Sequence, residues 1–124
     1  MSWPHFTDEE LFSPDTGTHK MDDTFMWRVE NLRVAMNRSF VVTSGYRTPE
    51  HNEKVSHTGR TGPHTTGRAI DISVSGWGAD VYKLVKLSIA QGFTGIGLNI
   101  KGEQWGRFVH LDDLEDPRPR IWTY

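Results

Sequence analysis

Apolar residues recur along this chain with two different periods. Between residues 22 and 37 they are spaced four, three and four positions apart, at Phe25, Val29, Leu32 and Met36. This spacing places them on one face of a helix, which Asp22 and Asp23 would begin. A second run with helical spacing, from Val81 to Ile89, is followed by Gly92, a residue typical of helix ends. The pattern therefore predicts two amphipathic helices, each with one buried face.

Four shorter runs have the length and residue types of strands. They cover residues 39–43, 69–74, 94–100 and 106–112. The last two are joined by Lys101-Gly102-Glu103-Gln104, which predicts a hairpin. In the second run, alternation places Asp71 and Ser73 on the same face of the strand. The tail, residues 116–124, is too rich in proline to predict regular structure.

Two further signals predict short helices. Thr7-Asp8-Glu9-Glu10 is a capping box, and Ser13-Pro14 would stop the helix that it begins. Thr48-Pro49 offers a cap and a first-turn proline for a helix through about Val55. From residue 56 to residue 68 the chain has no apolar period, so we expect a long loop, and loops of that length are usually functional or mobile.

Composition limits the class of protein. A chain of 124 residues, 35% of them hydrophobic, is expected to form one globular domain. Its formal net charge of −2 favours neither nucleic acid nor an anionic membrane surface as a partner. Cysteine is absent, so a metal site would use histidine and carboxylate ligands. The N-terminal sequence has no signal-peptide pattern and no window is apolar enough to span a membrane, so we expect neither feature.

The segment GRTGPHTTGRAID, residues 59–71, allows two interpretations. It is close to a phosphate-binding loop, but Arg68 and Ala69 replace the lysine and hydroxyl residue of that motif, and no strand precedes it. It also holds His64 and Asp71, separated by six residues, as possible metal ligands. The metal interpretation is favoured, although a solvated His64 and an Asp71 that binds nearby amides are alternatives.

A third ligand could come from the last predicted strand. Alternation in Phe108-Val109-His110-Leu111-Asp112 places Phe108, His110 and Asp112 on one face. Two imidazoles and one carboxylate are a ligand set for catalytic zinc, which leaves one position for water. A core imidazole with its hydrogen bonds satisfied is the alternative for His110.

Three motifs in order resemble the zinc D-Ala-D-Ala metallopeptidase family. They are SGYRTPEHN at residues 44–52, the spacing from His64 to Asp71, and FVHLD at residues 108–112, with a tryptophan shortly after. That family includes peptidoglycan D,D-carboxypeptidases and endopeptidases, vancomycin-resistance dipeptidases, phage endolysins and, more distantly, the hedgehog signalling domain. The resemblance runs from about Phe6 to Trp122, nearly the whole chain.

The resemblance implies roles for particular residues. His64, Asp71 and His110 would hold one Zn²⁺. Arg47 would bind substrate and polarise the scissile carbonyl, a task that suits its planar fork of donors, and a salt bridge that pins the loop is the alternative. Tyr46 is a second candidate for substrate contact, although a scaffold role as an aromatic wedge is favoured for it.

The chain departs from the family at two positions. Gly62 stands where many members have a serine, two residues before the first ligand, and Arg107 stands where several branches have an acidic general base. Proton transfer would then fall to Glu103 or Asp112. We expect Glu103 to transfer the proton and Asp112 to orient a ligand or Arg47, with a solvated turn residue as the alternative for Glu103.

Together these observations predict a single α+β domain, residues 1–124, in which helices flank a small antiparallel sheet and zinc sits in a surface cleft. The expected function is hydrolysis of peptide bonds in the stem peptides of bacterial peptidoglycan by a monomeric, phage endolysin-like enzyme. It would act on the wall after release from an infected bacterium, or from the virion. The rivals are a zinc-stabilised binding module without catalysis and a nucleotide or phosphate binder.

Overall fold

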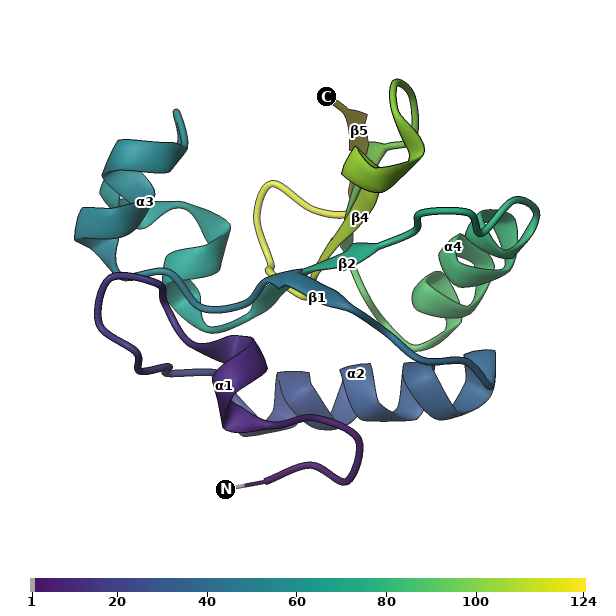
Figure 1. The fold of residues 1–124 in the computed structure, drawn as a ribbon, viewed down its shortest axis with the longest axis horizontal. Coiled ribbons are helices and arrows are strands. Elements are labelled where there is room, and N and C mark those ends of the chain that lie inside the picture. The colour runs from purple at the N-terminus through teal and green to yellow at the C-terminus, as the bar shows by residue number, and fades with distance from the viewer. Residues whose placement is uncertain (1) are drawn as a thin grey trace.

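The computed structural model describes residues 2–124, in which five strands form one sheet (Figure 1). Their order across the sheet is β1-β2-β4-β3-β5. Neighbouring strands are antiparallel, except that β5 runs parallel to β3. The strands are β1 (Val42–Ser44), β2 (Ala69–Ser73), β3 (Gly95–Asn99), β4 (Phe108–Asp112) and β5 (Arg120–Thr123).

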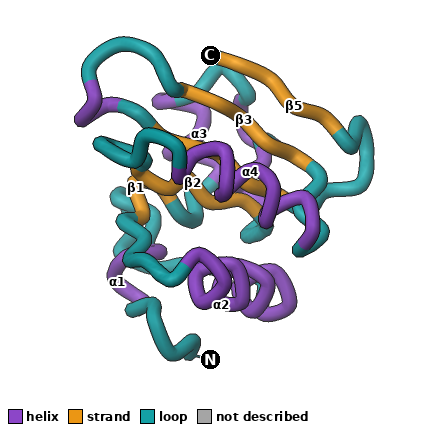
Figure 2. The backbone as a smooth tube through the Cα atoms, turned by 90° about the vertical axis from the view of Figure 1, so that its right-hand side faces the viewer, coloured by secondary structure: helices purple, strands orange, loops and turns teal. Residues whose placement is uncertain are grey.

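Helices lie on both sides of this sheet. They are α1 (Asp8–Leu11), α2 (Asp23–Met36), α3 (Pro49–Val55) and α4 (Asp80–Ala90), with short 3₁₀ turns η1 (Gly59–Thr61), η2 (Pro63–Thr66) and η3 (Gln104–Gly106). In Figure 1, α2 runs along the bottom of the molecule, whereas α3 and the β3–β4 loop rise from the sheet on the opposite side. Figure 2 gives the same layering from a second direction, with α2 beneath the strands. Among the described residues, no helix combines the length and hydropathy needed to cross a membrane.

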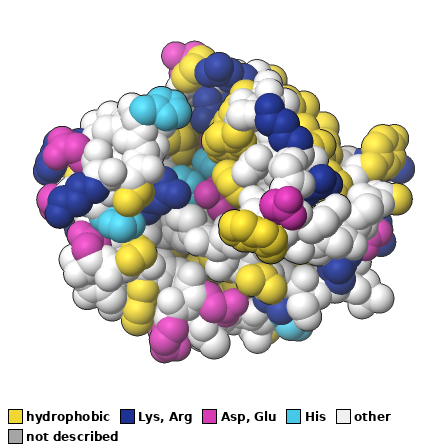
Figure 3. Space-filling model, turned by 45° about the horizontal axis from the view of Figure 1, so that its top comes forward, with side chains coloured by type: hydrophobic (Ala, Val, Ile, Leu, Met, Phe, Trp, Pro, Cys, Tyr) yellow, Lys and Arg dark blue, Asp and Glu magenta, His cyan; other side chains and the backbone are white. Residues whose placement is uncertain are grey.

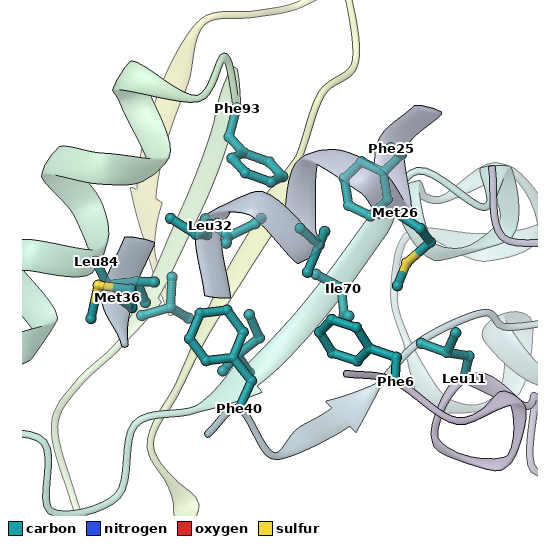
Figure 4. Packing of buried hydrophobic residues seen from close by; sticks show 14 of the residues in the cluster. Phe6, Leu11, Phe25, Met26, Leu32, Met36, Phe40, Ile70, Leu84 and Phe93 are labelled. Carbon is teal, nitrogen blue, oxygen red and sulfur yellow. The ribbon is translucent and has the colours of Figure 1, made fainter. Parts of the chain in front are cut away.

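The hydrophobic core fills the space between α2, α4 and one face of the sheet (Figure 4). Phe25, Val29, Leu32 and Met36, the four apolar positions of the predicted helix, are all buried in it. Leu84 of α4 and Ile70 of β2 belong to the same cluster. Because strand residues alternate between faces, burying one face against α2 leaves the other free to carry polar side chains.

That second face carries the chemically reactive residues. Asp71 on β2 lies directly across from His110 on β4, and Gly97 on β3 lies across from His110 on its other side. Cross-strand partners project from the same face of a sheet. The pairing register therefore fixes Asp71 and His110 as neighbours on the side of the sheet away from α2.

Two glycines in β3 make room on this face. A Cβ at Gly95 would overlap the carboxylate of Asp112 and lie 2.5 Å from Arg118 Nε. A Cβ at Gly97 would lie 2.7 Å from Trp122 Nε1 and 2.9 Å from the hydroxyl of Tyr124. These spacings are shorter than side chains tolerate, so β3 needs glycine at both positions for its neighbours to pack over it.

The expected α+β domain is confirmed, and its helices lie where the sequence places them. The capping box at Thr7 and the caps at Asp22 and Thr48 are all formed. The first strand begins at Val42, later than predicted, and ends at Ser44, and Phe40 of the predicted strand is buried in the core before β1 begins. Likewise, the segment from residue 56 to residue 68 is not an open loop, since η1 and η2 occupy half of it.

The expectation of an irregular tail is wrong. Residues Arg120–Thr123 form β5, which pairs with β3, and the Arg120 amide donates to the Thr94 carbonyl at 2.9 Å. Pro117 and Pro119 precede the strand rather than interrupt it, so neither removes a hydrogen bond from the sheet. This strand also makes the sheet mixed instead of purely antiparallel.

Replacing Gly95 with alanine should destabilise the protein by roughly 2–4 kcal/mol, because the new methyl group would displace the buried Asp112 and Arg118 side chains. Urea unfolding of Gly95→Ala measures this loss. Gly106→Ala is the matched control, since a Cβ there meets nothing within 4 Å. Equal stabilities of the two variants would show that β3 does not require glycine at position 95.

Candidate metal centre

His64 reaches the sheet from η2. The 3₁₀ turn runs from Pro63 to Thr66 and is capped by Gly67, whose φ of 76° is a left-handed conformation favoured by glycine. The Arg47 amide donates to the His64 carbonyl at 3.1 Å, and His64 Nδ1 donates to the Gly45 carbonyl at 2.8 Å. These bonds hold the His64 ring over the sheet with its Nε2 facing Asp71.

His110 is held in a similar way from β4. Its Nε2 donates to Asp112 Oδ2 at 2.7 Å, and its Nδ1 faces Asp71 Oδ1 at 3.0 Å. His64 Nε2 lies 3.2 Å from the same oxygen of Asp71. The three residues are buried, and one potential ligand atom from each lies within 4.8 Å of the others.

The donor set fits a metal ion. In a neutral imidazole one nitrogen carries a proton and the other carries a lone pair. The proton of His64 is committed to the Gly45 carbonyl and that of His110 to Asp112. Two nitrogen lone pairs and a carboxylate oxygen are therefore directed at one point, and such a group is stable around a cation. Two imidazoles and one carboxylate match the ligands that zinc prefers.

The carboxylates of the centre are ionised. Burial opposes the charge on Asp71, but when the two rings carry protons the positive charge of His64 and a hydrogen bond from His110 outweigh burial and hold the pKa of Asp71 below its usual range. Burial also opposes the charge on Asp112, and hydrogen bonds from His110 and Arg118 again bring its pKa below the usual range. Both carboxylates are therefore ionised at neutral pH.

Asp112 is fully buried and has no free oxygen. Besides the bond from His110, it accepts from Arg118 Nε at 2.9 Å on Oδ1 and from Arg118 Nη2 at 2.8 Å on Oδ2. A carboxylate paired in this way with an arginine is a weak proton acceptor. Its position suits the orientation of His110, as carboxylates behind metal-binding histidines often do.

Arg47 borders the three residues on the side of β1. Its Nε donates to Ser44 Oγ at 3.1 Å and its Nη1 donates to Asn52 Oδ1 at 3.0 Å. The remaining nitrogen, Nη2, lies 3.9 Å from Asp71 Oδ2. The guanidinium is thus fixed by two neutral partners, and one edge of it faces the candidate centre.

The other candidate residues from the sequence have no hydrogen bond or ion pair with the three ligands within residues 2–124. Tyr46 belongs to the hydrophobic core and is 5% exposed, which suits a scaffold role better than substrate contact. Glu103 is exposed at the start of η3, and within residues 2–124 its carboxylate has no hydrogen bond or ion pair. Arg107 donates from Nε and Nη2 to the Gly102 carbonyl, so it closes the β3–β4 loop.

Sequence reasoning did not assign three residues that β5 and the segment before it bring to this face. Arg118 pairs with Asp112, and the Trp122 ring lies 5.2 Å from the His110 ring. Tyr124 follows two positions later, with its ring 5.1 Å from that of Phe108. The alternation of Arg120, Trp122 and Tyr124 would have indicated a shared face, had the tail been recognised as a strand.

The surface around these residues is hollowed. In Figure 3 histidine, acidic and basic side chains gather in a central depression, with hydrophobic side chains along one side of it. A cavity of about 210 Å³ adjoins Arg47 and Ser44 on the side of α1 and α3, and Phe12, His51 and Val55 also line it. None of the three candidate ligands lines this cavity, and Arg47 is the residue that borders both the cavity and the candidate centre.

The family model described as Peptidase M15 matches residues 4–112, which include His64, Asp71, His110 and Asp112. No curated protein gives a match to the chain. The matched segment ends before Arg118, so β5 lies outside it.

Replacing Asp112 with asparagine should weaken zinc binding about 10-fold to 100-fold, because it removes the charge that fixes the His110 ring. A competition titration with a zinc-sensitive dye measures the affinity. Asp113→Asn is the matched control, since that carboxylate is also buried and bound by Arg28 and Arg68 but contacts none of the three ligands. Equal zinc affinities in the two variants would contradict an orienting role for Asp112.

Proposed function

Because the chain belongs to the peptidase M15 family of zinc metallopeptidases, we propose that it hydrolyses peptide bonds in the stem peptides of bacterial peptidoglycan. The observation that carries this proposal is the convergence of His64, Asp71 and His110 beside the fixed guanidinium of Arg47. Zinc is the cofactor of the family, and these three residues are the ones that would hold it. One chain supplies every residue of this site, so we propose that it acts as a monomer.

A zinc ion at this position would supply a Lewis acid that polarises a carbonyl group and activates water near neutral pH. Arg47 has one edge of its guanidinium toward the centre and is held by Ser44 and Asn52. Such a preorganised donor stabilises negative charge on a substrate oxygen without having to reorient during the reaction. We assign to Arg47 both the positioning of the substrate and the stabilisation of that charge.

Proton transfer is assigned to Glu103. Asp112 is committed to His110 and Arg118, whereas the carboxylate of Glu103 is exposed on the loop that rises beside the sheet. A general base must come within hydrogen-bond reach of the attacking water, directly or through one more water. A loop side chain with no competing partner among the described residues can adopt such a position when substrate binds.

An endolysin-like role in bacterial lysis is the biological setting that we propose. Its support is the resemblance of SGYRTPEHN and FVHLD to the motifs of a family that includes phage endolysins. The enzyme would reach the wall after release inside an infected bacterium, or it would be carried by the virion. Lysis of chloroform-treated bacteria on addition of the purified protein tests this setting separately from the chemistry.

One observation favours a second function. Arg107 occupies the position at which several related branches carry an acidic base, and its side chain binds the Gly102 carbonyl instead of facing the ligands. A zinc-stabilised module that binds the cell wall without cutting it would need no base. This module would sediment with purified peptidoglycan and release no new amino groups from it.

Incubation with purified peptidoglycan should release new amino groups, and mass spectrometry of the muropeptides should identify the bond that is cut. The activity should disappear with a chelator and return with added Zn²⁺. His64→Ala and Asp71→Ala should lose both bound zinc and activity, because each removes a ligand. Sedimentation with the wall and no change in the muropeptides would favour the binding module.

Arg47→Lys should lower kcat by about 100-fold, because lysine cannot reproduce a planar donor fixed by Ser44 and Asn52. Glu103→Gln should lower kcat by 100-fold or more if this carboxylate accepts the proton. Arg107→Lys is the control, and its kcat should stay within a factor of about three. Full activity of Glu103→Gln would remove Glu103 from the mechanism and leave the role of Arg47 intact.

A further inference from the structure

Tyr124 directly follows β5 and lies on the face of the sheet that carries the ligands. In the pairing of β5 with β3, Trp122 lies opposite Gly97, and Gly97 lies opposite His110 in the pairing of β3 with β4. Trp122 and Tyr124 are two positions apart, so both side chains project from the face of His110. Trp122 and Tyr124 therefore lie on the face of the ligands, and neither has a role in the mechanism proposed above.

The Tyr124 side chain leans over β3 toward His110. Its hydroxyl lies 2.9 Å from the place that a Cβ of Gly97 would occupy, and the Trp122 indole nitrogen lies 2.7 Å from the same place. The Trp122 ring is in contact range of the His110 ring, at 5.2 Å between centroids. The absence of a side chain at Gly97 therefore admits the hydroxyl to the immediate neighbourhood of His110.

The ring of Tyr124 is fixed, and its hydroxyl oxygen accepts a hydrogen bond from the Trp122 side chain, whereas within residues 2–124 the hydroxyl proton has no protein acceptor. The ring packs against Phe108, with 5.1 Å between centroids. Burial raises the pKa of Tyr124, and the charge of Asp71 acts in the same direction, so the hydroxyl is protonated at neutral pH. Tyr124 lies at the β5 edge of the sheet, opposite to the β1 edge from which Arg47 approaches, and it is close enough to Asp71 and Arg47 for both charges to act on its pKa.

We propose that Tyr124 is a further catalytic residue, whose hydroxyl donates a hydrogen bond to the scissile carbonyl oxygen as negative charge develops on it. This inference rests on the peptidase function proposed above. Arg47 and Tyr124 then act as two donors from opposite edges of the sheet, and both are held in place before substrate binds. Two preorganised donors are the usual composition of an oxyanion hole.

The test is Tyr124→Phe, which removes the hydroxyl and keeps the ring packed on Phe108. The substrate is the muropeptide that the wild-type protein cleaves. We expect kcat to fall about 100-fold with KM changed less than about threefold, because the lost donor acts on charge that develops only during reaction. Zinc content and the melting temperature should equal those of the wild type.

A second readout does not depend on turnover. A phosphinate analogue of the cleaved bond carries negatively charged oxygens in place of the carbonyl. Tyr124→Phe should therefore bind this analogue at least 10-fold more weakly than the wild type, whereas its affinity for the cleavage product should be unchanged. Tyr82→Phe is the matched control, because Tyr82 is 76% exposed on α4. It should match the wild type in both kinetics and analogue binding.

The outcomes separate this inference from the function on which it rests. Cleavage by the wild type, with kinetics and analogue affinity unchanged in Tyr124→Phe, would overturn the role of Tyr124 and leave the peptidase function standing. Tyr124→Phe could instead lose zinc or melt at a lower temperature while its folded, metal-loaded fraction stays fully active. That result would also overturn the catalytic role of Tyr124, because the role would then be structural. A wild-type protein that cleaves no muropeptide would overturn the proposed function, and the inference would fall with it.

Discussion

Three electron-pair donors directed at one buried point are the constraint on which the rest of this structure depends. His64 and His110 each commit a ring proton outward, to the Gly45 carbonyl and to Asp112, so that their other nitrogens face Asp71. Acceptors that face one another in the interior are costly unless a cation lies between them. A proton on His110 can supply part of the positive charge. Burial opposes this proton, but the hydrogen bonds with Asp112 and Asp71 outweigh burial, so the pKa of His110 is raised. A divalent metal satisfies all three donors at once.

The sheet makes this arrangement possible by keeping its two faces apart. Ile70, Ile72, Val109 and Leu111 are buried in the core, and each is a sequence neighbour of a residue on the opposite face. A slip of one residue in the pairing of β2 with β4 would turn these apolar side chains toward the site and the ligands toward α2. Burial of the apolar face therefore fixes the register that places Asp71 across from His110. The energy of the core is what holds the ligands together.

Most of the fold could be predicted from local sequence signals. The parts that could not be predicted depend on pairing between residues far apart in the chain. The spacing of Phe25, Val29, Leu32 and Met36 and the caps at Asp22 and Thr48 act within a few residues, so the sequence alone predicted α2 and α3. The ligand set was readable because His64, Asp71 and His110 stand in motifs with a resemblance to a known family. In contrast, β5 exists through its parallel pairing with β3, and the bond of Arg118 to Asp112 depends on that strand. No local pattern predicts the parallel pairing or the bond between Arg118 and Asp112. The prolines before β5 also argued against a strand in this segment.

Arg107 changes the charge of the site rather than its geometry. Within the described residues, the charge of Asp112 is balanced by Arg118, and that of Asp71 faces Arg47, so the protein brings no excess negative charge to the centre. An acid in place of Arg107 would offset part of the charge of a bound metal, whereas the arginine is withdrawn to the Gly102 carbonyl. The positive charge of a metal held by the three ligands would then remain available to stabilise an anionic oxygen. In the mechanism that we propose, the group that accepts a proton approaches from solvent, and the β3–β4 loop, which carries Glu103, is then the part of the fold on which catalysis depends.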